Sequence, residues 1–359
     1  MAAPHFSGHI WREGLFVPAE FSVEAGRIKG IQPVPKPPPR YIIPPYADPH
    51  IHGGWGFSFQ DAEFESLEKR LLQQGVFFAI PTLQNTGMAA LKKSAHLFKS
   101  YKKDNPQSIF PFLRVEGPFI SPVKKGFQRE DFILEVNPDH IQEFLSIDEI
   151  GLFTFAPERE GMQALVKQAL AQGKIPSFGH SQAAYADFLQ FYSMGVRHMT
   201  HYPNAMSGLH HREIGLTGAG LLKDDLLMEV IADGIHSSLD FLDLLLHVKG
   251  PNFGLASDMI PPAYCERPEF DGRRLHQKGK SFTTDAGVLA GGGTQISEQV
   301  HLLFEAGFQP EYLIPLACLN TLTAIGHPLP QMAEGAAASF LVLDERFDLQ
   351  EAYRWGNKQ

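Results

Sequence analysis

Side chains that can bind metal ions stand at the ends of successive short apolar runs in this sequence. The run YADPHIHG carries two histidines, IFPFLRVEGP carries a glutamate, and IPSFGHS and VRHMTHY each contribute a further histidine. Imidazole and carboxylate groups are common ligands of catalytic transition-metal ions, and histidine also titrates near neutral pH. The pattern therefore indicates metal-dependent catalysis by a set of residues comprising His50, His52, Glu116, His180, His201, Asp233, His236 and Asp258.

Three of these positions suit a catalytic metal site with an open coordination position. Glu116, His180 and His201 would supply three ligands and leave a fourth place for water. For each residue taken alone, a cap, a surface charge or a structural hydrogen bond is the more ordinary explanation. His50 and His52 alternate along an expected strand, so both rings face the same side and can reach one ion. A turn with two exposed histidines is the alternative interpretation of that pair.

Two further polar positions and one glycine run have competing interpretations. Asp258 follows the last expected strand and can be a metal ligand or a general base, or else a helix N-cap. Arg212, within His210-His211-Arg212-Glu213, suits bidentate capture of phosphate or carboxylate, or else lies in a solvated turn. The three glycines at 291–293 are not followed by Lys-Ser/Thr, so we interpret them as a flexible loop and exclude a Walker-type site.

The elements that must position these residues alternate between strands and helices. Helical stretches include residues near 63–75, MAALKKSAHLFKSYKK, MQALVKQALAQ, AAYADFLQFYSMG and SSLDFLDLLLHVKG, and more follow at QISEQVHLLFEAG and PEYLIPLACLNTLTAIG. Eight strand–helix units predict an α/β fold, a (β/α)8 TIM-type barrel, with the polar strand ends gathered on one face. A doubly wound sheet is the alternative, but it would need a glycine-rich turn after its first strand. The eight expected strands are YADPHIHG, VFFAIPTL, IFPFLRVEGP, GLFTFAPE, IPSFGHS, VRHMTHY, LLMEVIADG and NFGLASD.

The two ends of the chain differ from this central pattern. Residues 1–45 contain short apolar runs broken by glycine and proline, and residues 34–46 are a proline-rich extended connector. Residues 327–359 contain one more apolar strand, Phe340–Leu343. We expect both ends to build one small β-sandwich domain beside a catalytic barrel of residues 46–326, because chain termini often meet.

Composition and charge exclude several classes of protein. The 359 residues carry 31 Lys and Arg against 40 Asp and Glu, a net charge of −9, which disfavours nucleic-acid binding. No apolar stretch approaches the ~18–20 residues of a membrane span, so no membrane association is expected. Two cysteines exclude a disulfide scaffold, and the first residues do not resemble a signal peptide. We therefore expect a cytoplasmic protein.

Several segments share their order and spacing with a known family. They are His50-x-His52-Gly53, Val115-Glu116-Gly117-Pro118-Phe119-Ile120-Ser121 with Lys124-Lys125-Gly126, Gly179-His180-Ser181, Thr200-His201-x-x-Asn204-Ala205-Met206 with His211-Arg212-Glu213, Ile231-Ala232-Asp233-Gly234-Ile235-His236, and Ser257-Asp258. Together they resemble N-acetylglucosamine-6-phosphate deacetylase of the amidohydrolase superfamily. The resemblance is strongest from Glu116 to Asp258 and extends more weakly from about Tyr46 to Leu343.

The resemblance implies a metal-dependent hydrolase that removes acetate from the sugar phosphate. Glu116, His180 and His201 would hold the main divalent ion, and His50 and His52 a second one, with Glu116 bridging. Asp258 would be the acid/base acting through metal-activated water. The family arginine reaches across a dimer interface, so the resemblance also implies a homodimer. The substrate-binding residues it implies are Gln128, Asn204, Ala205, Arg212, Asp233, His236, Leu289, Ala290 and Gly291.

The chain departs from the family pattern near the expected substrate. Gln128 stands where the family usually has a histidine that polarises the acetyl carbonyl, and glutamine can donate a hydrogen bond but cannot be a cation. Arg114 stands near a position that is often histidine. The loop Leu289-Ala290-Gly291-Gly292 replaces the usual Leu-Ala-Gly-Ser.

Alternatives to the leading hypothesis follow from these departures. The substrate could be another N-acyl amino sugar, such as N-acetylgalactosamine 6-phosphate, because the sequence does not resolve the stereochemistry of one hydroxyl. A sugar-phosphate-binding protein with weakened catalysis is the alternative outside the enzymes, favoured by Gln128 alone. The ligand types suit one or two ions of Zn²⁺, Fe²⁺, Mn²⁺ or Co²⁺.

Overall fold

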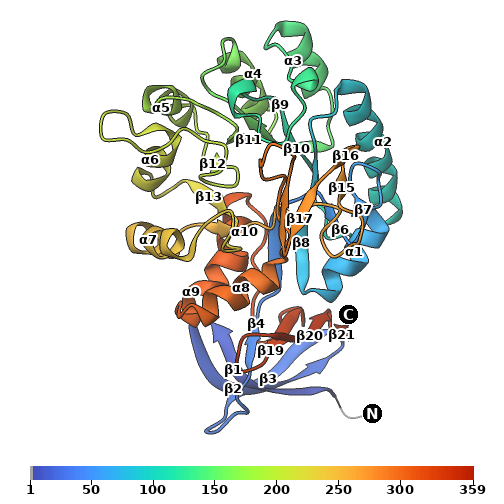
Figure 1. Ribbon diagram of the computed structural model, residues 1–359. Helices are drawn as coiled ribbons and strands as arrows, with labels where there is room; N and C mark the ends of the chain where they lie inside the picture. Colours follow the sequence, from blue (N-terminus) through green and yellow to red (C-terminus); the bar gives the residue numbers. More distant parts are fainter. Residues whose placement is uncertain (1–2) are drawn as a thin grey trace.

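The computed structural model describes residues 3–359 and contains a parallel barrel with a second, smaller sheet at one end (Figure 1). The eight barrel strands lie in the hydrogen-bonded order β14-β13-β12-β11-β10-β9-β8-β5. Each matches one apolar run of the sequence, so the TIM-type α/β fold is confirmed. Their bounds are β5 (Tyr46–Ile51), β8 (Val76–Leu83), β9 (Leu113–Phe119), β10 (Ile150–Phe155), β11 (Ile175–Phe178), β12 (His198–Met199), β13 (Leu227–Val230) and β14 (Gly254–Leu255).

The barrel closes between its first strand and the segment that follows its last. Ile51 pairs with Met259 in a parallel bridge, and the Asp258 amide donates to the His50 carbonyl at 2.8 Å. This closure places the residue expected to act as acid/base beside the HxH pair, although the two lie far apart in the sequence.

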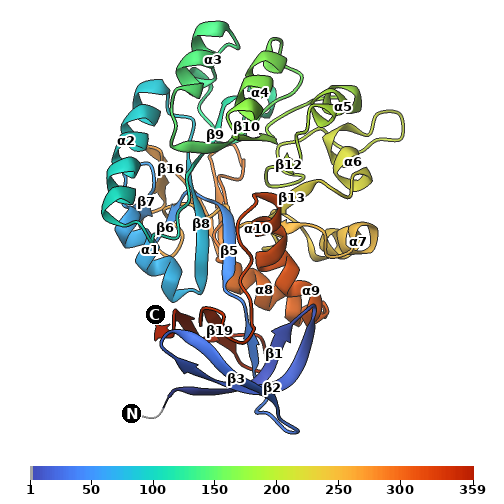
Figure 2. The ribbon, with the colours of Figure 1, turned by 180° about the vertical axis from the view of Figure 1, so that it is seen from behind.

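Helices surround the barrel, as Figures 1 and 2 show. In α1 the buried residues Phe64, Leu67, Glu68 and Leu71 follow the 3.6-residue period of a helix packed on one face. Two helices, α3 and α6, were not expected from the sequence. The outer helices are α1 (Phe64–Gln73), α2 (Met88–Asp104), α3 (Pro138–Leu145), α4 (Met162–Ala171), α5 (Tyr185–Ser193), α6 (Gly215–Leu222), α7 (Leu239–Lys249), α8 (Ile296–Glu305), α9 (Pro310–Ile314) and α10 (Asn320–Ala324).

Both chain ends build the smaller sheet. Its strand order is β21-β20-β19-β4-β1-β2-β3, so the C-terminal strands join the N-terminal ones through β4, which lies inside the expected proline-rich connector. The sheet folds over its own apolar face, since Phe6 and Phe21 both contact Phe340 edge-on. The bounds are β1 (His5–Arg12), β2 (Leu15–Glu24), β3 (Arg27–Pro33), β4 (Tyr41–Ile43), β19 (Phe340–Leu343), β20 (Leu349–Arg354) and β21 (Asn357–Lys358).

Three short hairpins lie in the loops that follow the first and last barrel strands. Phe270 of β15 stacks on Phe127 with ring centroids 5.3 Å apart, and its ring lies 5.9 Å from that of His52. The hairpin of β15 and β16 therefore reaches the loop of residues 122–132, which holds two short 3-10 turns at Pro122–Lys124 and Glu130–Phe132. The hairpin strands are β6 (Gly53–Gly54) and β7 (Phe57–Ser58), β15 (Glu269–Phe270) and β16 (Arg273–Arg274), and β17 (His276–Lys278) and β18 (Ser281–Thr283).

The domain boundaries at 45/46 and 326/327 stay predictions. Within residues 3–359, no helix has both the length and the apolar character needed to cross a membrane.

Candidate metal-dependent active site

The expected ligands meet at a cavity of about 580 Å³ formed at the carboxyl ends of the barrel strands. The cavity wall includes polar residues at the strand ends and residues of the loops that follow them. This location is where (β/α)8 barrels carry their catalytic residues. The expected site residues that line it are His52, Glu116, Gln128, His180, His201, Asn204, Ala205, His236, Asp258, Leu289, Ala290 and Gly291.

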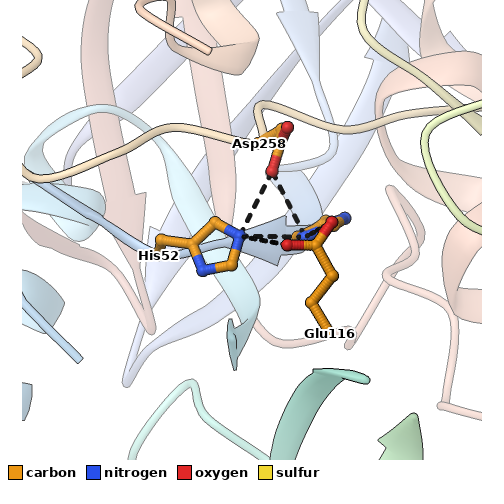
Figure 3. A group of neighbouring side chains, drawn as sticks. His52, Glu116 and Asp258 are labelled. Atoms are coloured by element: carbon orange, nitrogen blue, oxygen red, sulfur yellow. Dashed lines mark hydrogen bonds and ion pairs between the residues drawn. The ribbon is translucent and has the colours of Figure 1, made fainter. Parts of the chain in front are cut away.

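One group of four buried ligands consists of His50, His52, Glu116 and Asp258. Figure 3 shows the last three converging on one point. The Nε2 atoms of His50 and His52 lie 3.2 Å apart, and Asp258 Oδ1 lies 3.2 Å from the first and 3.3 Å from the second. Glu116 Oε2 lies 3.4 Å from His52 Nε2. Four donors therefore converge from β5, β9 and the segment after β14.

A second group shares Glu116 with the first. Glu116 Oε1 lies 2.8 Å from His180 Nε2 and 2.7 Å from His201 Nε2, and the two nitrogens are 3.1 Å apart. The two oxygens of one carboxylate thus face two separate donor groups. This geometry suits two neighbouring ions bridged by Glu116, or one ion held mainly by Glu116, His180 and His201.

The backbone at the site adopts a conformation that non-glycine residues rarely take. His180, His201 and Asp258 have φ values of 47°, 30° and 47°. Such left-handed residues cost about 1–3 kcal/mol each and cluster at functional sites. All three of these side chains line the cavity.

Hydrogen-bond partners on the far ring nitrogen orient two of the four histidines, and a carboxylate lies near that nitrogen of a third. His52 Nδ1 lies 3.1 Å from the Thr82 carbonyl, and His180 Nδ1 lies 2.8 Å from the Lys124 carbonyl. His50 Nδ1 lies 3.5 Å from a carboxylate oxygen of Glu229. A carbonyl or carboxylate on one nitrogen fixes the proton there and leaves the other nitrogen free to bind a metal.

The electrostatics of the cluster fit a bound cation. Burial would raise the pKa of Glu116, but the charge of His180 and hydrogen bonds with His180, His201 and His52 hold it well below its usual range. Burial opposes protonation of His52, yet Asp258 and Glu116 raise its pKa to about 9. Burial and then the Arg114 charge lower the pKa of His50 to about 4, leaving the neutral ring that a metal needs. The buried carboxylates therefore attract positive charge to this site, and the residues present fit a divalent ion.

The expected substrate residues form the cavity wall, with two exceptions. Gln128 is buried, donates from Nε2 to Glu116 Oε2, and accepts from the Asn85 amide at 3.0 Å. Arg212 is exposed beside His211, outside the cavity lining. Asp233 also lies outside the lining.

Asp233 acts on its neighbour His236, which does line the cavity. Its Oδ2 lies 2.8 Å from His236 Nδ1, and its Oδ1 accepts from the amides of Ile235 and His236. Burial alone would lower the pKa of His236, but the hydrogen bond and charge of Asp233 raise it. Asp233 therefore favours a cationic ring at the cavity wall.

Sequence reasoning missed one pair of residues beneath the site. Glu229 and Arg114 are fully buried and form an ion pair inside the barrel. The sequence signal was present, because Glu229 is a carboxylate within the otherwise apolar run LLMEVIADG. Nothing local indicated which residues it would meet.

The fold and the two buried donor groups are consistent with a metal site of the amidohydrolase type. No protein-family model matches the chain. An N-acetylgalactosamine-6-phosphate deacetylase of Escherichia coli O157:H7 is 26% identical over 97% of this chain and 96% of its own length. Further relatives from bacteria to mammals are named N-acetylglucosamine-6-phosphate deacetylases and are 24–29% identical.

Solved structures agree with these relatives. The N-acetylglucosamine-6-phosphate deacetylase of Thermotoga maritima superposes with a TM-score of 0.92 at 29% identity, covering 99% of both chains. A variant of the Mycobacterium smegmatis enzyme in complex with N-acetyl-D-glucosamine-6-phosphate shares the fold, with a TM-score of 0.91 at 20% identity over 100% of this chain and 99% of its own. Over almost its whole length the chain therefore resembles the N-acetylglucosamine-6-phosphate deacetylases of the amidohydrolase superfamily.

Proposed function

We propose that this protein hydrolyses the acetamide of N-acetylglucosamine 6-phosphate to glucosamine 6-phosphate and acetate. The observation that carries the proposal is the position of Asp258, which faces two imidazole nitrogens at 3.2 and 3.3 Å and also lines the cavity. A carboxylate placed between metal ligands and a substrate-sized space can exchange protons with a reacting water. The names of the relatives supply the substrate class.

The proposed cofactor is one or two divalent ions of Zn, Fe, Mn or Co. Glu116, His180 and His201 would hold the main ion, and His50, His52 and the second Glu116 oxygen would hold the other. When bound, such an ion lowers the pKa of water towards ~7 and polarises a carbonyl. The donor set contains nitrogen and oxygen without thiolate, which suits any of these metals.

Asp258 is the proposed acid/base. Its pKa is lowered, because the interactions with His50 and the hydrogen bond from His52 outweigh the burial that would raise it. An ionised carboxylate can accept the proton of the attacking water. It can then deliver that proton to the nitrogen of the amino sugar, which would otherwise leave as an unstable anion.

The remaining wall is proposed to orient the sugar phosphate. Asn204, the Ala205 backbone and His236 would contact the sugar and its phosphate, and Leu289, Ala290 and Gly291 would contact the substrate from the opposite loop. Ala205 has a φ of 54° and its carbonyl accepts from the Ser181 amide at 3.0 Å, so its backbone is held in place. Gln128 would donate its amide hydrogen bond near the acetyl carbonyl.

The proposed role of Arg212 requires a homodimer. The side chain lies on an exposed loop outside the cavity of its own chain, and that loop also exposes Leu209. Arg212 would reach the phosphate in the cavity of the partner subunit. We further propose a cytoplasmic location, since both Cys265 and Cys318 are free thiols.

The galactose epimer is the second candidate substrate. The relative named N-acetylgalactosamine-6-phosphate deacetylase covers almost the whole chain, at an identity similar to those of the relatives named for the glucose compound. Gln128 stands where the family usually has histidine. A third candidate is therefore a homologue that binds sugar phosphates and has weakened catalysis.

One assay distinguishes these candidates. Purified, metal-replete protein is incubated with N-acetylglucosamine 6-phosphate, its galactose epimer and unphosphorylated N-acetylglucosamine, and acetate release is measured. We expect turnover of the phosphorylated glucose compound above the other two. Preference for the epimer would reassign the substrate, and no release from any compound with metal bound would contradict the deacetylase proposal.

A further inference from the structure

Glu229 lies in the barrel interior directly beneath the candidate metal ligands. It belongs to β13, between the strand that precedes His201 and the last barrel strand, and its side chain is fully buried. The proposed reaction gives this carboxylate no role. A buried charge needs partners, because its desolvation is costly.

The two carboxylate oxygens of Glu229 have different neighbours: one contacts the Arg114 cation, and the other lies near the candidate metal ligands His50 and His201. Oε1 pairs with Arg114 Nη1 and lies 3.4 Å from His198 Nε2. Oε2 lies 3.5 Å from His50 Nδ1 and 3.4 Å from the backbone nitrogen of His201. One carboxylate thus faces the ring of one candidate ligand and the backbone of another.

Arg114 also contacts the two strand ends that carry His50 and His201. Its Nη1 donates to the Pro49 carbonyl at 3.0 Å, immediately before His50. Its Nη2 donates to Thr200 Oγ1 at 2.9 Å, immediately before His201. The ion pair therefore ties together the backbones that carry a ligand of each metal group.

We propose that Glu229 is a positioning residue for His50 and so sets the affinity of the ion held by the HxH pair. This inference rests on the proposed function, in which His50 and His52 bind a metal. His50 Nδ1 has no hydrogen-bond partner among the described residues, and a carboxylate oxygen of Glu229 lies 3.5 Å from it. Glu229 is the carboxylate that can keep the proton on Nδ1 and direct Nε2 towards the ion, an arrangement whose loss typically weakens metal binding by about 10–100-fold.

A purely structural role would have a different signature. A buried ion pair often contributes little stability compared with apolar residues of similar size. Removing both charges together should therefore leave the barrel folded. A selective loss of one metal site would then report on His50 and not on folding.

The test compares Glu229→Gln, the double variant Arg114→Met with Glu229→Gln, and a matched control, Glu68→Gln. Glu68 is another buried glutamate, bonded to Ser108 and the Ile109 amide at the outer helix α1. Metal-free protein is titrated with Zn²⁺ against a chelating indicator to obtain each dissociation constant. The variant His52→Ala identifies which constant belongs to the HxH pair. Circular dichroism confirms folding.

We expect both Glu229 variants to raise the dissociation constant of the HxH site by about 10–100-fold and to leave the other constant unchanged. The control should change neither. Unchanged binding in the folded double variant, or an equal loss at both sites, would overturn the inference. A single ion that His52→Ala does not affect would also overturn it. Failure of the unmodified protein to bind Zn²⁺ at either group would instead contradict the proposed function itself.

Discussion

Replacing Asp258 by asparagine should remove proton transfer while keeping the shape of the site. Asparagine has nearly the same volume, so the cavity and the two neighbouring imidazoles should stay in place. The amide cannot accept the proton of the attacking water at neutral pH. General acid–base catalysis contributes about 10²–10⁴-fold, which corresponds to about 2.7–5.4 kcal/mol of barrier. We expect kcat to fall by that factor.

Three measurements on the same preparation test this expectation. Acetate release gives kcat, calorimetric titration with N-acetylglucosamine 6-phosphate gives substrate affinity, and elemental analysis gives the metal content. Because Asp258 Oδ1 also lies within 3.3 Å of both imidazoles of the HxH pair, metal loss must be distinguished from loss of the base. Affinity for the substrate should be retained, and the main ion should remain.

A matched control is Asp240→Asn, an exposed aspartate at the start of α7. It should leave all three quantities unchanged. Retention of kcat within tenfold of the unmodified enzyme by a metal-replete Asp258→Asn protein would refute the acid/base role. Loss of substrate affinity together with turnover would assign Asp258 to binding instead.

Four further outcomes are expected. Protonated His236 should bind phosphate, so KM for the phosphorylated substrate should rise as pH increases through the raised pKa of this ring. Asp233→Asn should move that rise in KM to lower pH. An unchanged pH profile of KM in this variant would contradict the pairing of Asp233 with His236. Gln128→Ala should lower kcat/KM by about 10²-fold if its amide stabilises the acetyl oxygen, and Gln128→His should recover most of that loss, whereas wild-type kinetics in the alanine variant would argue against contact. Arg212→Ala should raise KM for the phosphorylated sugar alone, and an equal effect on N-acetylglucosamine would remove Arg212 from the phosphate site. Chelation should abolish turnover and lower Tm, with both restored by added metal, because an ion that binds only the folded state stabilises it; a chelated enzyme that remains active would contradict metal dependence.

The barrel itself was predictable because its signal is local. Each of the eight parallel strands is a short apolar run, and most of the helices carry an apolar stripe at helical spacing. A candidate ligand or other polar residue at the end of six of these runs marks the strand ends that face the site. These features depend only on neighbours in the sequence, so the candidate ligands could be identified before any contact was known.

The helices α6 and α3 were not predicted from the sequence, for different reasons. α6 has the sequence GLTGAGLL, whose glycines disfavour a helix in isolation. Close packing explains why a glycine stands in this helix: a Cβ on Gly220 would lie 2.5 Å from the Tyr202 ring. α3 is short, and its start is set by Pro138 and by Asn137, whose side chain accepts from the His140 amide.

By itself, the sequence determined the ligand types, the order of the strands and the family resemblance. Only the tertiary structure decided which atoms meet: that the two Glu116 oxygens face different histidine groups, that barrel closure brings Asp258 to His50, and that Glu229 pairs with Arg114, 115 residues away. Asp233 likewise proved to hold His236 and to lie outside the cavity lining. The reason is that periodicity specifies which face of an element is buried, whereas the pairing of buried polar groups depends on distances between strands that are remote in the chain.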